Sequence, residues 1–306
     1  MKLAIFYASY LYFPAAIYLG WRLSKRGGTR KIASAFALAV LSTLAYARFI
    51  EPRILLSVKH QATIQRCFPE SGRARLAVFS DMHEGLFPNA VPIERIARRV
   101  NEAKPDAAFI AGDFVYFLDP KRETETFAAL RSIKAPVFAV LGNHDIGLPG
   151  PDVGDSLSAA LQTDGVAMLD DKITTVTLAG AEVEIVGLSE LWAKNQNRGL
   201  LEKRGEKPRL VLTHNPSTIL ELRPREAVDF MIAGHTHGGQ INIPGLSCFI
   251  LPSMCRVTLY GFSQEERGLV FVTSGTGMVG LPMRFNRAPR IDLIDLSWRA
   301  CAQGVE

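Results

Sequence analysis

Residues 75–85 read RLAVFSDMHEG, a stretch in which a short apolar segment passes directly into a polar one. The apolar part, residues 75–80, is rich in β-prone side chains and predicts a buried strand. Asp81 and His83 follow where that strand is expected to end. Because functional groups in α/β proteins lie beyond the carboxyl ends of the strands, this junction indicates an α/β fold and the first part of a site.

The alternation of apolar strands and helices continues downstream. Residues 93–103 have helical spacing, with Ile93, Ile96, Ala97 and Val100 on one face. The next segments predict strand, helix, strand and helix in turn, at residues 107–111, 124–133, 136–141 and 156–162. This order favours a mainly parallel sheet covered by helices. The later half predicts a second, more mixed sheet, with strands at residues 166–169, 174–178, 183–186, 209–212, 230–232, 269–273 and 291–296.

Polar side chains of a consistent kind follow five of the predicted strands. They are Asp81 and His83, Asp113, the trio Asn143, His144 and Asp145, His214 with Asn215, and the pair His235 and His237. Five of the six histidines belong to this set, which leaves only His60 outside it. Each element alone is commonly structural, but five in one order, each after an apolar strand, indicate a site. Residues i and i+2 of an extended chain project to the same side. The pair Asp81 and His83 and the pair His235 and His237 are therefore each predicted to present both side chains in one direction. Imidazoles and carboxylates together suit manganese, iron or zinc.

These blocks resemble the pattern of the calcineurin-like metallophosphoesterase superfamily: D-x-H, GD, GNH[D/E], H and GHxH. Residues 234–240 (GHTHGGQ), followed by INIP, and residues 280–286 (GLPMRFN) are similar to its membrane-associated YkuE/YaeI-type phosphodiesterase branch. Two segments depart from that branch. Residues 187–190 read GLSE where the branch commonly has Gly-x-Asp-Asp, and residues 273–275 read TSG in place of its Ser-Arg-Gly. Both departures lie outside the metal blocks, so they leave substrate preference open.

The resemblance implies a four-layer α/β/β/α sandwich over residues 70–300 that holds two divalent metal ions. Carried over position by position, it assigns Asp81, His83 and His237 to one metal and Asn143, His214 and His235 to the other, with Asp113 bridging them. His144 is the group expected to protonate the leaving oxygen, and Asp145 is expected to orient the His144 ring. Gly238 and Gly239 are expected to let the backbone turn sharply beside the phosphate.

The first part of the chain predicts a membrane anchor over residues 1–55. Two uncharged runs, residues 3–21 and 32–47, flank a basic connector that contains Gly27 and Gly28 together with Arg22, Lys25, Arg26, Arg30 and Lys31. Five positive charges favour a cytoplasmic connector, which would place the following domain on the outer face of a bacterial-type inner membrane. Basic residues on the far flank (Arg48, Arg53 and Lys59) weaken that assignment, although Arg48 can also snorkel outward. A buried helical hairpin and an export signal ending at Ala45-Tyr46-Ala47 are the alternatives.

Charge and cysteine content limit the possible partners. Residues 1–60 carry nine basic residues and one acidic residue, whereas residues 61–306 carry 26 basic and 29 acidic residues. The main domain therefore has no basic surplus for nucleic acid, which makes nucleic acid an unlikely partner on sequence grounds. The four cysteines show no metal-ligand spacing and are interpreted as buried or free thiols.

Together these features predict a membrane-anchored, dinuclear metal-dependent phosphoesterase. Its substrate is expected to be a phosphodiester, phosphomonoester or pyrophosphate of a lipid or lipid-linked compound. Apolar residues 249–252 and 279–283 are candidates for a lipid-receptive rim, and Arg284, Arg287 and Arg290 are candidates for phosphate contacts. One alternative is a UDP-2,3-diacylglucosamine pyrophosphatase of lipid A synthesis, which needs a cytoplasm-facing domain. A second alternative is a non-catalytic scaffold of the same fold. Substrate, metal identity and oligomeric state stay open.

Overall fold

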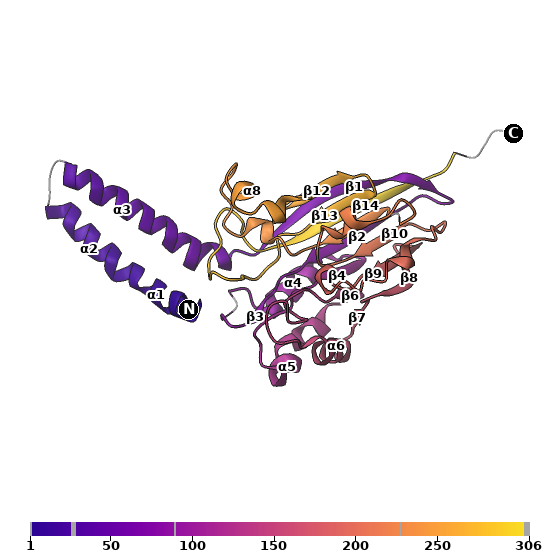
Figure 1. The fold of residues 1–306 in the computed structure, drawn as a ribbon, viewed down its shortest axis with the longest axis horizontal. Coiled ribbons are helices and arrows are strands. Elements are labelled where there is room, and N and C mark those ends of the chain that lie inside the picture. Colours follow the sequence, from indigo (N-terminus) through magenta and orange to yellow (C-terminus); the bar gives the residue numbers. More distant parts are fainter. Residues whose placement is uncertain (1, 26–28, 89, 227, 303–306) are drawn as a thin grey trace.

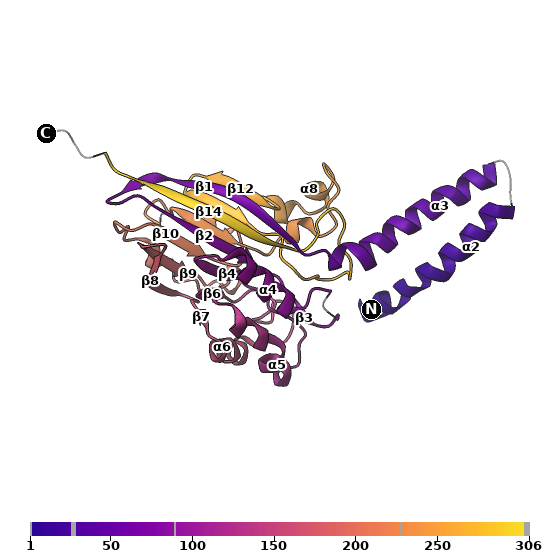
Figure 2. The same ribbon diagram turned by 180° about the vertical axis from the view of Figure 1, so that it is seen from behind.

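The computed structural model describes residues 2–25, 29–88, 90–226 and 228–302. Two six-stranded sheets lie face to face, and a helical hairpin projects from one end of them (Figure 1; Figure 2 shows the reverse view). The first sheet has the order β1 (Leu56–Phe68), β14 (Arg290–Ala300), β2 (Gly72–Phe79), β4 (Ala107–Ala111), β6 (Val137–Val140) and β7 (Val166–Met168). The second has the order β12 (Gly261–Glu265), β13 (Gly268–Val272), β11 (Phe230–Ala233), β10 (Arg209–Leu212), β9 (Ala181–Gly187) and β8 (Lys172–Leu178).

The central strands are apolar throughout because both of their faces are buried. In β4, Ala108 and Ile110 pack under the helices, whereas Ala107, Phe109 and Ala111 pack toward the second sheet. Strand β11 alternates in the same way between the layer shared by the two sheets and the far side of the second sheet. A strand buried on both sides reads as a continuous apolar run, which is the signal that the sequence carried.

Helices cover the two outer faces unequally. The first sheet is covered by α4 (Ile93–Ala103), α5 (Glu123–Phe127) and α6 (Gly154–Thr163). The far face of the second sheet is covered by short elements, among them α7 (Thr218–Glu221). The chain therefore has the mixed α/β sandwich that was predicted, with a thin fourth layer.

Several elements differ from the sequence-based expectations, three of them in ways that bear on the sheets and their covering helices. The helix predicted at residues 124–133 is α-helical only in α5 and continues as a 3₁₀-helix over Ala128–Ser132. Strands β1 and β12 were not predicted, because both are edge strands in which polar residues interrupt the apolar pattern. The main domain was predicted to begin at residue 70, but β1 lies before that residue and pairs in parallel with β14 along most of its length. The two-sheet domain therefore includes β1.

The N-terminal segment forms two helical spans that pack side by side (Figure 1). The first comprises α1 (Lys2–Ala8), a 3₁₀-turn (Ser9–Leu11) and α2 (Tyr12–Lys25); the second comprises α3 (Thr29–Ala45), a π-helical turn (Tyr46–Ile50) and a 3₁₀-turn (Glu51–Arg53). By length and composition, the spans Lys2–Leu23 and Thr29–Arg53 are able to cross a membrane. Arg26, Gly27 and Gly28 of the predicted connector lie outside the described residues.

The hairpin is fixed to the two-sheet domain at its base. The ring of Phe6 stacks on that of Phe87 with a centroid distance of 5.7 Å. The buried carboxylate of Glu51 accepts hydrogen bonds from the backbone N–H groups of Asn286, at 3.0 Å, and Arg287, at 2.6 Å. Arg48 does not snorkel outward as the sequence suggested: it is buried, and its guanidinium lies 4.3 Å from the centroid of the Phe6 ring.

The cysteine interpretation was wrong. Cys67 pairs with Cys301, and Cys248 pairs with Cys255. The first disulfide joins the ends of β1 and β14, which lie 234 residues apart in the chain, and the second closes the loop around α8 (Ser247–Ile250). Spacing alone could not reveal the first pair, because its partners meet only through the sheet.

Candidate metal centre

The predicted ligands lie where strands end in unusual backbone turns. Asp81, His83, Asp113, His235 and His237 all have positive φ, between 50° and 71°. The backbone of the pairs is therefore not extended, and the reason given for their shared direction was wrong, although Asp81 and His83 do converge. Left-handed conformations cost free energy for residues other than glycine, and such strained residues cluster at functional sites. Here they turn the chain back over the sheet edge so that side chains from several loops converge.

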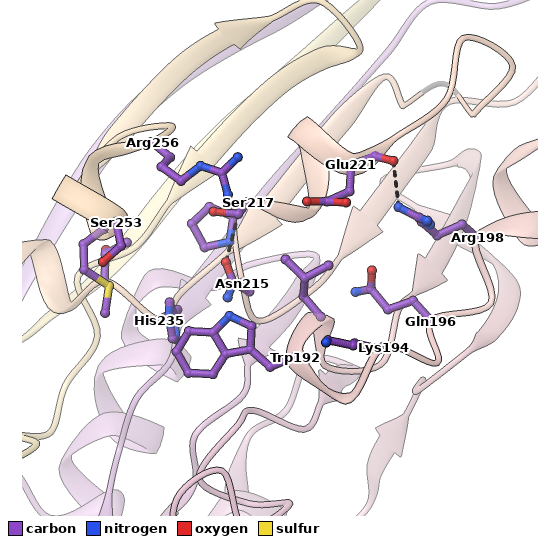
Figure 3. Close-up of a pocket in the computed structure, with 14 residues that line it drawn as sticks. Trp192, Lys194, Gln196, Arg198, Asn215, Ser217, Glu221, His235, Ser253 and Arg256 are labelled. Atoms are coloured by element: carbon purple, nitrogen blue, oxygen red, sulfur yellow. Dashed lines mark hydrogen bonds between the residues drawn. The ribbon is translucent and has the colours of Figure 1, made fainter.

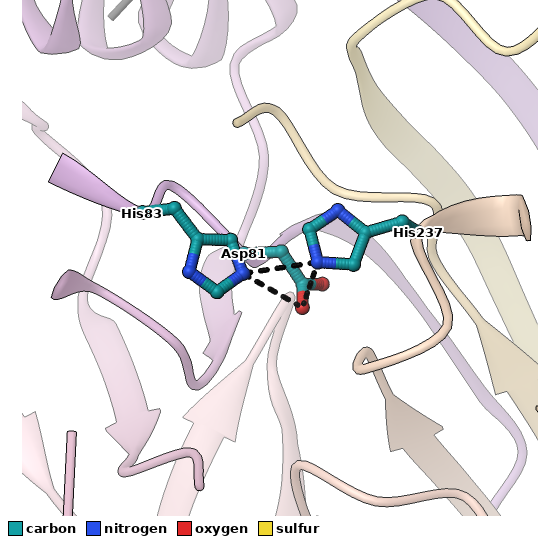
Figure 4. A group of neighbouring side chains, drawn as sticks. All are labelled: Asp81, His83 and His237. Carbon is teal, nitrogen blue, oxygen red and sulfur yellow. Dashed lines mark hydrogen bonds and ion pairs between the residues drawn. The ribbon is translucent and has the colours of Figure 1, made fainter. Parts of the chain in front are cut away.

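Asp81, His83 and His237 form the first group of converging side chains (Figure 4). The Nε2 atoms of the two histidines face each other at 2.9 Å. The Oδ1 atom of Asp81 lies 3.4 Å from His237 Nε2 and 3.9 Å from His83 Nε2. All three residues are buried.

Asp113, His214 and His235 form a second group beside the first. Asp113 Oδ2 lies 3.2 Å from His214 Nε2, which in turn lies 3.1 Å from His235 Nδ1. The amide oxygen of Asn143 lies 3.2 Å from the same His214 nitrogen. Asp113 Oδ2 is also 3.5 Å from His83 Nε2, so this carboxylate lies between the two groups.

The chemistry of these groups fits divalent cations. Asp81 Oδ1 is buried and accepts no hydrogen bond within the described part of the chain. Burial lowers the pKa of His83 and the pKa of His235 to about 3 each, so both imidazoles are neutral near pH 7. Burial alone would raise the pKa of Asp113, but His214 lowers it well below its usual range and keeps this carboxyl ionised. Burial raises the pKa of Asp81 to about 7, whereas burial alone would lower the pKa of His214 but Asp113 raises it well above its usual value. Both groups therefore carry protons near pH 7 that a bound cation would displace.

Contacts outside each group orient the ligands. His214 Nδ1 lies 2.7 Å from the carbonyl oxygen of Ala111, which directs Nε2 toward Asp113. Close packing also requires small residues here: a Cβ on Gly142 would stand 2.2 Å from Asp113 Oδ1. Gly238 and Gly239 have φ of 60° and 82° and make the predicted turn, but a Cβ on Gly238 would meet Arg287.

The arginines predicted to meet phosphate have structural contacts instead. Arg284 is fully buried and donates to the carbonyl oxygens of Gly277, Ser274 and Arg287. Its Nη2 atom lies 3.4 Å from His237 Nδ1. Arg290 is also buried, and its guanidinium lies 4.4 Å from the centroid of the Tyr260 ring. Arg284 therefore supports the loop behind a candidate ligand and does not face a substrate.

His144 forms a third cluster with His83 and Asp113, one residue from each of the two groups, but Asp145 does not orient its ring. The Nδ1 atom of His144 lies 3.0 Å from the carbonyl oxygen of Pro149. Asp145 is fully buried and accepts hydrogen bonds from the backbone N–H groups of Val115, at 3.0 Å, and Gly142, at 2.8 Å. The predicted orienting role thus falls to the Pro149 carbonyl, whereas Asp145 holds two loops together.

The structure adds residues that no motif indicated. The ring of Tyr116 stands perpendicular to that of His144, with a centroid distance of 5.0 Å, and Lys2 donates a hydrogen bond to the Tyr116 hydroxyl. The indole of Trp192 stands perpendicular to the His235 ring at 4.7 Å. Tyr116 lies in the two-residue strand β5 (Val115–Tyr116), Trp192 in a 3₁₀-turn (Leu191–Ala193) and Lys2 in α1, and no local pattern marks a partner far along the chain.

The sandwich and its Asp/His centre define a metal-dependent phosphoester hydrolase. The calcineurin-like phosphoesterase family model matches residues 74–239, and the chain belongs to that family. It is similar to the uncharacterized metallophosphoesterase YkuE of Bacillus subtilis, with 29% identity over 90% of this chain and 98% of that protein. The phosphodiesterase YaeI of Escherichia coli is 27% identical over 86% of this chain and 96% of its own length. The UDP-2,3-diacylglucosamine pyrophosphatase LpxG of Chlamydia muridarum is 25% identical over 82% and 92%, respectively.

Proposed function

We propose that this chain is a membrane-anchored, two-metal phosphoesterase that hydrolyses a lipid or lipid-linked phosphoester. One observation carries the proposal: a cavity of about 660 Å³ joins the candidate metal ligands to an apolar surface. Asp113, Asn143, His235 and His237 line one part of this cavity. Its apolar part is lined by Ile243, Leu246, Ile250, Leu251, Val279 and Leu281. A small water-soluble phosphate ester would gain little from these apolar side chains, whereas an acyl or isoprenoid chain would be buried against them.

The position of the hairpin supports a lipid substrate. Lys2, at the start of the first span, lines the same cavity. Two neighbouring apolar side chains are strongly exposed on α8: Phe249 is 83% exposed and Ile250 is 61% exposed. An exposed apolar rim beside a helical anchor is suited to contact with a bilayer surface. A lipid head group could then reach the centre without leaving the membrane boundary.

The residues around the centre have separable roles in hydrolysis. Divalent ions held by the two groups would polarise the phosphate oxygens and lower the pKa of a bound water. Asp113 keeps the groups together from its place between them. His144 lines the cavity, and its Nδ1–H donates to the Pro149 carbonyl, so Nε2 of the doubly protonated ring is the atom that would deliver a proton to the leaving oxygen.

We place the domain on the outer face of a bacterial-type inner membrane. The basic connector supports this orientation through the positive-inside rule. The two disulfides also support it, because disulfides persist in oxidising compartments and are rare in the cytosol. The second candidate, a UDP-2,3-diacylglucosamine pyrophosphatase, is favoured by the similarity to LpxG but needs a domain that faces the cytoplasm. The scaffold alternative is disfavoured because all seven candidate ligands are present and converge.

The proposal is tested with the full-length protein in detergent. We expect roughly two divalent ions per chain and hydrolysis of bis-p-nitrophenyl phosphate and of a phospholipid in mixed micelles. Asp113→Asn should lose metal and at least about 100-fold in activity, because it removes the carboxylate between the groups. A metal-free, inert wild-type protein would favour the scaffold. Hydrolysis of the small diester without any of the lipid would remove the lipid part of the proposal.

A further inference from the structure

A second cavity, of about 580 Å³, adjoins the metal centre, and polar and charged side chains line much of it (Figure 3). The two cavities share four lining residues, Trp192, His235, Thr236 and Met254. Because His235 belongs to the second ligand group, both cavities open onto the same centre. A substrate bound there would extend into two compartments.

The second cavity carries a positive charge. Lys194, Arg198 and Arg256 line it, together with one carboxylate, that of Glu221. Among the described residues, none of these three cations forms an ion pair. Arg198 Nη1 donates to the backbone carbonyl of Glu221 at 2.7 Å, which fixes its guanidinium without neutralising it (Figure 3). Unpaired cations facing a cavity are suited to an anionic ligand.

Trp192 gives the cavity a flat aromatic wall beside the centre. Its side chain is 48% exposed, and its backbone N–H donates to Glu190 Oε1 at 3.1 Å. Glu190 is buried, so this hydrogen bond fixes the turn that carries Trp192 and Lys194 to the interior of the domain. The indole can therefore present a fixed surface to a sugar or a base.

We propose that this polar cavity is a subsite for an anionic head group of the substrate. The apolar cavity takes the lipid chain, and the hydrolysed phosphoester lies between the two, beside His235. This inference rests on the proposed function and adds the chemistry of the substrate's second half: an additional negative charge on a polyol, sugar or nucleoside. A volume of 580 Å³ is within the range of sites for such groups.

The test compares pairs of inhibitors that differ by one phosphate. Inhibition of bis-p-nitrophenyl phosphate hydrolysis is measured with fructose 6-phosphate and fructose 1,6-bisphosphate, and with thymidine 5′-monophosphate and thymidine 3′,5′-bisphosphate. One phosphate can occupy the metal centre in each case, so the ratio of inhibition constants reports the second anion. We expect the bisphosphates to inhibit about tenfold more strongly, as one well-placed charge-assisted contact allows.

Substitution of the exposed cations should abolish that ratio. In Lys194→Ala/Arg256→Ala the ratio should fall toward one, whereas the matched control Lys121→Ala/Arg225→Ala, on exposed residues outside the cavity, should keep it. Trp192→Leu distinguishes the possible head groups. Weaker inhibition by the thymidine phosphates alone supports a nucleoside, and equally weakened inhibition by the thymidine and fructose phosphates supports a sugar or polyol.

The subsite and the hydrolytic function fail in different ways. Wild-type protein that hydrolyses the diester but shows no advantage for either bisphosphate overturns the subsite alone. The subsite is also overturned if the double variant keeps the wild-type ratio while its thermal midpoint is unchanged. Wild-type protein that binds metal but hydrolyses no ester overturns the proposed function instead.

Discussion

Asp113 is the residue on which the geometry of the centre depends. One of its carboxylate oxygens lies near His214 and His83, which belong to different groups. The other oxygen accepts the backbone N–H of His144 at 2.9 Å. A single short side chain therefore contacts three loops that carry histidines. The left-handed backbone conformation of Asp113 costs free energy, which these contacts offset.

The role of His144 can be separated from metal binding. His144→Ala should keep the metal content of the wild type, because the ring is not one of the seven residues assigned to metal by position. Turnover of an unactivated phosphodiester should fall by roughly 10²- to 10⁴-fold, the usual contribution of a positioned acid. Metal analysis and steady-state kinetics on the same preparation check both expectations.

The leaving group supplies the control for this variant. p-Nitrophenolate needs little protonation when it leaves, so bis-p-nitrophenyl phosphate should be affected less than an alkyl diester. Full activity of His144→Ala toward the alkyl diester would contradict the assignment of His144.

At the scale of elements, strand ends and long-range tethers set the site. The loop that contains Arg284 is held by the backbone of Ala47 and by the carboxylate of Glu51, both in the second helical span. Arg284 in turn stands behind His237. The N-terminal helical hairpin is thus connected, through one loop, to a candidate metal ligand.

The disulfide between Cys67 and Cys301 should stabilise the first sheet. Cys67→Ser/Cys301→Ser should lower the free energy of unfolding by roughly 2–4 kcal/mol, because the bond closes a long loop between β1 and β14. Chemical denaturation of the protein in detergent measures the change. Cys248→Ser/Cys255→Ser is the matched control: its partners are only seven residues apart, so the loss should be smaller. A larger loss in the control would contradict loop closure as the source of the stabilisation.

At the scale of the whole molecule, the hairpin, the apolar rim and the metal centre lie at the same end of the sandwich (Figure 1). The candidate metal ligands therefore face the region where the hairpin enters the domain. A lipid-linked substrate would approach from the membrane side, and its polar half would extend into the cavity beside Trp192.

The orientation of the chain is the prediction that belongs to this scale. Alkaline phosphatase fused after Glu306 should be active, and green fluorescent protein at the same position should be dark, because two spans return the chain to the outer face. Fusions placed after Lys25 should report the opposite side and serve as the control. A fluorescent, phosphatase-inactive fusion after Glu306 would place the domain in the cytoplasm and favour the pyrophosphatase alternative.

Much of the fold was predictable because its signals are local. Strands buried on both faces must be apolar throughout, and helix α4 must alternate with a period of 3.6 residues, so residues 107–111 and 93–103 were assigned from the sequence alone. The edge strands β1 and β12 were missed because an edge needs no continuous apolar run.

The sequence by itself determined the α/β class, the family and the set of candidate ligands, since each rests on residue types placed directly after apolar strands. The tertiary structure supplied the distances among those ligands: it brings His235 close to Asp113 and His214, and His237 close to Asp81 and His83. It also replaced the expected contact of Asp145 with that of Pro149, paired the four cysteines, and brought Lys2 and Trp192 to the centre. For Lys2 and for the Cys67–Cys301 pair the physical reason is separation along the chain: a contact between residues more than a hundred positions apart leaves no local pattern, and it exists only when the two sheets and the hairpin have packed.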